Sequence, residues 1–76
     1  MKYVVLLMKE GETPIIFPNR VHHEEIADAV EHREVISAGF VYLSDGKITC
    51  GGASLGLGLP SLEEDDTILI QRQMTV

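Results

Sequence analysis

A glycine-rich segment that ends in four acids, CGGASLGLGLPSLEEDD (residues 50–66), contains the residue types that most suggest chemistry. A Walker-type phosphate loop needs a lysine directly after its glycines, and residues 48–71 contain neither lysine nor arginine. A dinucleotide-binding loop needs a third glycine, but Ser61 follows Gly56 and Gly58. The acids would also repel a phosphate from the following helix start. We therefore predict no phosphate-binding loop here.

The glycines have a second use if they belong to a sheet. The Asp45-Gly46 pair is typical of a two-residue type I′ hairpin turn, and this turn fixes the register of its two strands. Phe40 then lies over Gly51, as an aromatic ring covering a glycine of the neighbouring strand. The same register places four small residues opposite one another on one face, as a small-residue floor: Ser37, Gly39, Gly52 and Ser54. Either a packed element or a bound ligand approaches this floor closely.

Candidate donors for an anion gather before the first predicted helix. Arg20, His22 and His23 lie at its amino end, where backbone N–H groups are also free. Glu24 and Glu25 compete with an anion there, so an ordinary loop arginine is the alternative. Together with the floor and the neighbouring Phe40 ring, these donors make up the predicted ligand-binding set: Arg20, His22, His23, Ser37, Gly39, Phe40, Gly52 and Ser54.

Other reactive side chains form weaker patterns. Asp28 and His32 share a helical face, but no His-Glu-x-x-His spacing or telling third ligand accompanies them, so we predict no metal and no cofactor. Cys50 falls opposite Val41 in mid-strand, where an inert core cysteine lies. A hydrolase that uses Cys50 and a histidine is the least favoured of the functions considered.

Two hairpins and two helices would position these residues. Residues 2–9 are apolar on both faces and predict a central strand, and residues 14–17 predict an edge strand after a turn. The second hairpin begins near Arg33 and turns at Asp45-Gly46. The expected fold is α+β, with a four-stranded, mainly antiparallel sheet and two helices in the order ββαββα. The whole chain, residues 1–76, is expected to form a single domain.

Capping boxes mark the start of both helices. His22 and Glu25 have the spacing of one box, which predicts a helix over residues 23–32. Ser61 and Glu64 have the spacing of another, which predicts a helix over residues 62–73. Within the second helix, three residues are predicted to face inward: Leu62, Leu69 and Ile70.

Composition limits the partners. The 76-residue chain has a formal net charge of −6, so it lacks the basic face that general nucleic-acid binding needs. Its apolar runs are too short for a membrane span or a signal peptide, and its single cysteine suits a reducing compartment, so the cytoplasm is expected. A hydrophobic content of 45% is high for a chain with no disulfide, and predicts a homo-oligomer.

The second half of the chain resembles small phage and prophage accessory proteins of unknown function. The likeness is carried by VISAGFV (residues 35–41), by the Cys-x-Gly-x-Ser pattern of residues 50–54, and by Leu57-Gly58 before an acidic helix start. Gly56 stands where that pattern has a serine, and Leu62-Glu63 where it has Arg-Pro. The likeness implies a host cytoplasm and a role in binding.

Two functions follow from that likeness as expectations. The first is a non-enzymatic, counter-defence binding protein that sequesters a small ligand such as a nucleotide signal on the floor or between subunits. The alternative is a protein–protein inhibitor that presents its acidic surface, Glu63 to Asp66, to a basic surface of a host protein. Sequestration requires an open floor, whereas inhibition tolerates a filled one.

Overall fold

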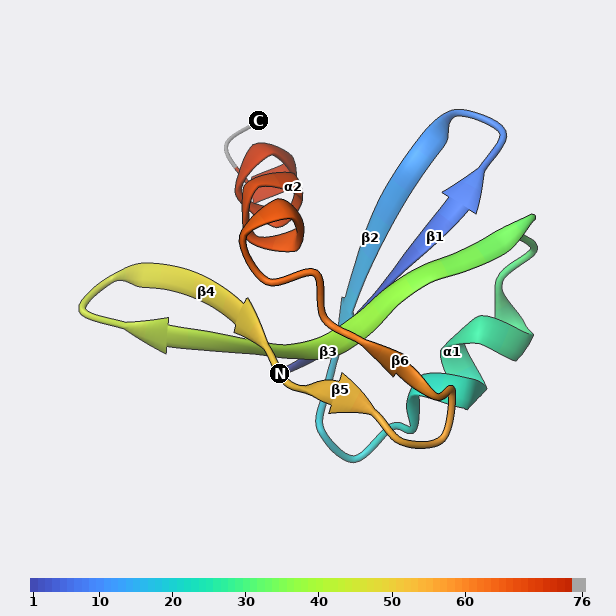
Figure 1. Cartoon of the computed structure of the whole chain (residues 1–76), viewed down its shortest axis with the longest axis horizontal. Coiled ribbons are helices and arrows are strands. Elements are labelled where there is room, and N and C mark those ends of the chain that lie inside the picture. The colour runs from blue at the N-terminus through green and yellow to red at the C-terminus, as the bar shows by residue number, and fades with distance from the viewer. Residues whose placement is uncertain (75–76) are drawn as a thin grey trace.

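The computed structural model describes residues 1–74 and has the predicted α+β fold (Figure 1). Four strands form an antiparallel sheet in the order β2-β1-β3-β4, so β1 and β3 are central. A separate two-stranded hairpin, β5-β6, precedes the last helix. In chain order the elements are β1 (Lys2–Met8), β2 (Gly11–Phe17), α1 (His23–Ala29), β3 (Glu34–Ser44), β4 (Lys47–Gly51), β5 (Ala53–Ser54), β6 (Leu59–Pro60) and α2 (Glu64–Met74).

The first hairpin is tighter than predicted. Met8 pairs with Gly11, so only Lys9 and Glu10 remain in the turn, and Gly11 has a φ of 120° that favours glycine. β2 therefore begins at Gly11 and not at Pro14. It remains an edge strand, as the proline predicted.

The second hairpin has the predicted turn but a shorter ladder. Ser44 pairs with Lys47 across the Asp45-Gly46 turn, and the predicted register holds as far as Phe40 opposite Gly51. The backbone then turns at Gly52, whose φ is 76°. The predicted pairings of Gly39 with Gly52 and of Ser37 with Ser54 are therefore wrong. Residues after Gly52 pair with β6 instead, in the β5-β6 hairpin.

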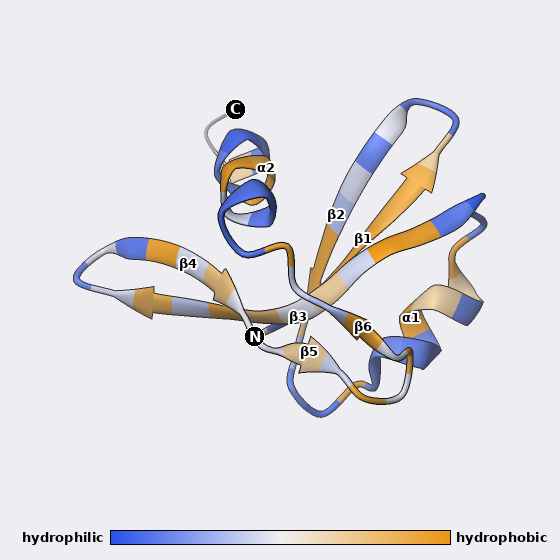
Figure 2. Ribbon diagram, in the orientation of Figure 1, coloured by the Kyte–Doolittle hydropathy of each residue, from blue (hydrophilic) through white to orange (hydrophobic). Residues whose placement is uncertain are grey.

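The two helices cover opposite faces of the sheet. Alternate residues of β1 point to these two faces and belong to two different hydrophobic clusters. Tyr3 and Val5 pack with Cys50 and with Ile70 of α2. Val4 and Leu6 pack with Phe17 and Ala38, and the α1 segment covers this second cluster through half-buried Val21, Ile26 and Val30. β1 is accordingly apolar along most of its length in Figure 2.

Both helices differ from prediction at one end. α1 begins after His22 as predicted, and the Glu25 carboxylate accepts a hydrogen bond from the His22 N–H at 2.9 Å. It ends at Ala29 and not at residue 32, because Val30 adopts an extended conformation. α2 begins at Glu64, two residues later than predicted, after Glu63 with a φ of 47°.

Among residues 1–74, none of the helices has the length and apolar character needed to cross a membrane.

Candidate functional site

The small-residue floor is filled at Gly39. A Cβ atom on Gly39 would lie 2.5 Å from the Gly51 carbonyl oxygen, 3.0 Å from Ser61 Cβ and 3.3 Å from the Tyr3 ring. Ser37 is fully buried, and its hydroxyl has no hydrogen-bond partner among the described residues. At this point the glycine is needed because other parts of the same chain pack against it.

Those parts belong to a buried polar network that sequence reasoning missed. The Tyr3 hydroxyl donates to Asp66 Oδ2 at 2.5 Å, and Ser61 Oγ lies 2.5 Å from the same phenol oxygen. Asp66 is 2% exposed although it ends a run of four acids. Burial raises the pKa of Tyr3 strongly, and the hydrogen bond to Asp66 raises it further, so the phenol remains protonated and can donate.

The same network fixes the backbone that leads into α2. Asp66 Oδ2 also accepts a hydrogen bond from the Leu62 N–H at 2.9 Å, and Ser61 Oγ accepts one from the Glu63 N–H at 2.9 Å. These bonds use N–H groups before the helix and hold Glu63 in its left-handed conformation. The start of α2 is therefore held in one geometry by groups that the sheet buries.

This anchored start presents an acidic ridge, which we define as Leu62, Glu63, Glu64, Asp65 and Ile68. All five are exposed, and the two apolar members, Leu62 and Ile68, are 46% and 42% exposed. Leu62 was predicted to face inward and points to solvent instead, because the helix begins after it. Within residues 1–74 the three carboxylates form no ion pair with a basic side chain. The ridge therefore combines unneutralised negative charge with apolar surface.

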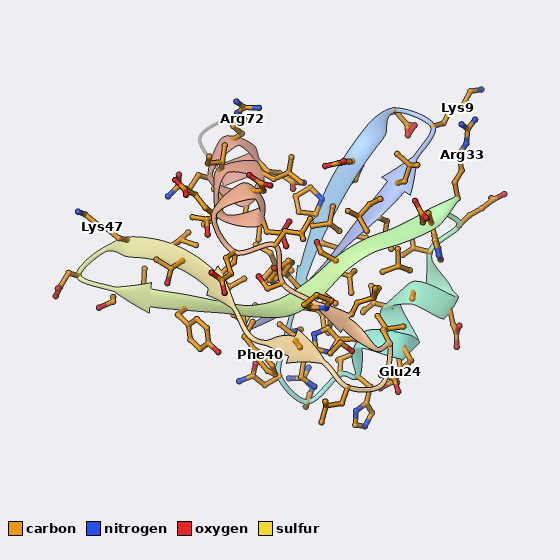
Figure 3. The ribbon with its side chains drawn as sticks, in the orientation of Figure 1. Lys9, Glu24, Arg33, Phe40, Lys47 and Arg72 are labelled. Carbon is orange, nitrogen blue, oxygen red and sulfur yellow. The ribbon has the colours of Figure 1, made fainter. Side chains whose placement is uncertain are left out.

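A second candidate site is a shallow cavity of about 320 Å³ between the amino end of α1 and the β5-β6 hairpin. Figure 3 shows Phe40 and Glu24 on this side of the molecule. A Cβ atom on Gly56 would overlap the Glu24 carboxylate, so α1 and the hairpin are in close contact here. Four of the predicted ligand-binding residues line this cavity beside Lys2 and Leu55: His22, His23, Phe40 and Ser54. We call it the Phe40 cavity.

Most donors of the Phe40 cavity already have partners. His23 is buried, its Nε2 lies 2.9 Å from the Gly39 carbonyl oxygen, and its ring packs edge-on against Phe17 and Phe40. Ser54 Oγ accepts from the Leu57 N–H at 3.2 Å. The exposed ring of His22 and the half-exposed ring of Phe40 remain available to a ligand.

The other predicted ligand-binding residues lie outside this cavity. Arg20 is exposed in the loop before α1 and does not line it. A Cβ atom on Gly52 would lie 3.1 Å from the Phe40 ring, so the Gly52 backbone packs closely against that ring. Ser37 and Gly39 belong to the interior of the sheet.

Cys50 has the environment of a core residue. It is buried among Tyr3, Val5 and Ile70. Burial raises the pKa of its thiol, an effect that a hydrogen bond to Thr67 partly opposes. A raised pKa lowers the thiolate fraction and hence the nucleophilicity at neutral pH. Among residues 1–74, no three His, Cys, Asp or Glu side chains are grouped to hold a metal ion.

A third hollow, of about 430 Å³, lies where the β1-β2 turn meets the start of β3. Lys9 and Arg33 line it, and Figure 3 shows both side chains extending at this end of the molecule. Glu10 and Glu31 line the same hollow. Because two acids accompany the two bases, the hollow has no strong preference for an anion or a cation.

Comparisons of this chain with protein-family models, with curated proteins and with solved structures give no match. What each surface can bind is therefore inferred from its own geometry. One sequence signal could have indicated the missed network: Asp66 lies four residues before Ile70, which was predicted to face inward, and this spacing places both on one helical face. The structure buries both residues.

Proposed function

We propose that this protein is a non-enzymatic binding protein that uses its acidic ridge to contact a basic surface of another protein. The observation that supports this proposal is the anchoring of the ridge by Tyr3, Ser61 and Asp66. A ridge that is already ordered loses little conformational entropy on binding, so more of its interaction energy contributes to affinity. The filled floor at Gly39 removes the open surface that sequestration there requires.

The chemistry of the ridge defines the kind of partner. Three unneutralised carboxylates suit a cluster of lysines and arginines, and they would increase the rate of encounter by electrostatic attraction. Leu62 and Ile68 would supply the apolar contact that a lasting complex needs, since exposed ion pairs alone contribute about 0–1 kcal/mol each. The resemblance to phage accessory proteins suggests a bacterial host protein in the cytoplasm as this partner.

The test compares three immobilised baits in a bacterial lysate. The ridge variant carries Glu64→Lys and Asp65→Lys, and the matched control carries Glu10→Lys and Glu12→Lys, which change the net charge equally on another exposed surface. We expect a basic protein to bind the wild type and the control but not the ridge variant, as measured by mass spectrometry. Equal losses for both variants, or no protein that distinguishes them, would contradict the proposal.

Sequestration of a small anionic ligand is the second candidate, and it now rests on the Phe40 cavity. It is favoured by the gathering of His22, His23, Phe40 and Ser54 around one hollow next to Lys2. The Lys2 ammonium also donates to the Val21 carbonyl oxygen at 3.0 Å, and Glu24 lines the same hollow and opposes an anion. A volume of about 320 Å³ falls at the lower end of small-ligand sites. An aromatic ring with a nearby cation would suit a base and a phosphate of a nucleotide.

Calorimetry against a panel of linear and cyclic nucleotides tests this second candidate. We expect His22→Ala and Phe40→Leu each to weaken any binding at least about threefold, by loss of a polar contact or of ring stacking. Arg20→Ala is the control, because Arg20 does not line the Phe40 cavity. Heat changes that are unaffected by the two cavity variants would exclude the Phe40 cavity as the binding site.

A further inference from the structure

The end of the second hairpin extends beyond the rest of the sheet. The β3–β1 ladder runs from Glu34 to Phe40, the Val41 N–H donates to the Met1 carbonyl oxygen at 2.7 Å, and Cys50 is buried in the core, so residues 42–49 form a two-stranded arm, which we call the hairpin arm (Figure 1). Tyr42 and Leu43 point to opposite faces of this arm and are 51% and 74% exposed. Two strands alone are marginally stable in water, so an arm with two large exposed apolar residues would gain stability from a further strand.

The outer edge of β4 is open at one residue. Ser44 and Lys47 flank the two-residue turn and form a hydrogen-bonded pair, and hydrogen-bonded pairs then alternate along the ladder. The N–H and C=O groups of Ile48 and Cys50 therefore point outward. The Cys50 N–H donates to Thr67 Oγ1 at 2.9 Å, whereas both backbone groups of Ile48 lack a partner within residues 1–74.

The opposite edge of the sheet is closed to a further strand. By the same alternation, Pro14 of β2 directs its nitrogen outward, because its pairing with Val5 falls between hydrogen-bonded pairs. Proline has no N–H to donate, and a proline on an edge strand prevents pairing with another chain. β4 is thus the edge to which a strand can be added.

Charge indicates which strand would add. The hairpin arm contains one acid and one base, Asp45 and Lys47, so it is neutral on a chain with a net charge of −6. A second copy that binds through its own arm brings two neutral surfaces together. Contact through the acidic ridge or through α1 would instead place carboxylates against carboxylates, which is unfavourable.

We propose that the protein is a homodimer in which the β4 strands of two copies pair antiparallel about Ile48, the outward-facing residue whose backbone groups are free, so that the two four-stranded sheets join edge to edge. The Cys50 N–H, which donates to Thr67, takes no part in this pairing. Ile48 and the partner's Ile48 would exchange two N–H···O=C hydrogen bonds across the two-fold axis. Leu43 lies opposite Ile48 on the same face, so the dimer would align Leu43, Ile48, the partner's Ile48 and the partner's Leu43 in one apolar row. Lys47 would face Thr49 of the partner subunit.

The test uses sedimentation or light scattering at about micromolar to about millimolar concentration, a range that covers weak dimers. We expect the wild type to reach twice the monomer mass of 8.4 kDa. Ile48→Pro should remain monomeric, since it removes an outward N–H and no bond within the ladder, and it should lose some stability because the Ile48 side chain packs against the core cluster. Ile48→Val, which keeps the donor, should still dimerise. Leu43→Asp should weaken dimerisation at least about tenfold, because it places a charge in the apolar row.

If a variant fails to fold, hydrogen exchange on the wild type tests the proposed dimer independently. In the dimer the Ile48 amide is hydrogen-bonded, so its exchange should slow as the protein concentration rises. The amide of Glu12, which points outward from the closed β2 edge, is the control and should exchange at the same rate throughout. A monomer at every concentration, a dimer that Ile48→Pro leaves intact, or fast and concentration-independent exchange at Ile48 would overturn the proposal.

Discussion

The phenol of Tyr3 joins β1 to Ser61 and Asp66 through hydrogen bonds that span 58 and 63 positions of the sequence. Tyr3→Phe would keep the ring and remove the hydroxyl, leaving a buried carboxylate and a buried serine without that partner. We expect a loss of about 1–3 kcal/mol in the free energy of unfolding, measured with urea. Tyr42→Phe is the matched control and should change stability little, because Tyr42 is half exposed and its hydroxyl has no hydrogen bond among the described residues.

The same variant tests the anchoring of the acidic ridge. If Tyr3 holds the start of α2, hydrogen exchange at the Leu62 and Glu63 amides should accelerate in Tyr3→Phe more than exchange in the middle of β1. Equal acceleration everywhere would indicate a global loss of stability without a local role for the phenol. Binding of a partner to the ridge should then weaken together with this local protection.

Cys50 and Tyr3 make the fold sensitive to alkali. Burial raises the pKa of Cys50 above its ordinary value of 9.0 and that of Tyr3 above 10.0. The folded chain therefore keeps protons that the unfolded chain releases, so stability is full below about pH 8 and falls as the pH rises through and above these ordinary values. Cys50→Ala should make the fall between about pH 8 and about pH 10 less steep in urea titrations, whereas an unchanged slope would contradict a raised thiol pKa.

At the scale of elements, the contact between the α2 start and the sheet depends on the absence of a side chain at Gly39. Gly39→Ala would place a Cβ atom 2.5 Å from the Gly51 carbonyl oxygen, on backbone that cannot move aside without breaking the ladder. We expect this variant to lose about 1–3 kcal/mol or more of stability.

Gly51→Ala is the matched control for that substitution. Its Cβ atom would meet only the Tyr42 ring, at an ordinary 3.5 Å, so stability should be unchanged or slightly higher, since alanine restricts the unfolded chain more than glycine does. Thermal unfolding of the two variants side by side is the measurement. A Gly39→Ala variant as stable as Gly51→Ala would show that the floor is open in solution.

How far the sequence predicted these elements depends on how local their determinants are. Asp45-Gly46 fixes its own turn and the nearby register, and both were predicted correctly as far as Gly51. The departure at Gly52 depends on a positive φ, which a glycine permits but does not require, so the pattern could not reveal it. The burial of Asp66 was missed because its partner Tyr3 is 63 positions away, and an acidic run is usually solvated.

Prediction of the candidate site was also limited because its residues are distant in the sequence and are brought together by non-local contacts. His22, His23, Phe40 and Ser54 come together around the Phe40 cavity, but the β5-β6 hairpin that forms one wall has two residues in each strand and little pattern of its own. The predicted floor failed because it extrapolated a local register beyond the residue at which the ladder ends. The Asp45-Gly46 turn determines the pairing of the few residues next to it, as far as Gly51, but it does not determine the pairing after Gly52, where the backbone turns away.

At the scale of the whole molecule, the two proposed associations should respond to salt in opposite directions. Two copies that each carry a net charge of −6 repel one another, and salt screens that repulsion, so dimerisation through the hairpin arm should strengthen as salt is added. Binding of a basic partner to the acidic ridge is attractive, so salt should weaken it. Measuring both affinities at roughly 0.05 M and roughly 0.5 M sodium chloride brackets the range over which screening changes most. A dimer that dissociates in salt would indicate an interface of opposite charges, which the neutral hairpin arm does not provide. A partner whose affinity is unaffected by salt would be bound by some surface other than the acidic ridge.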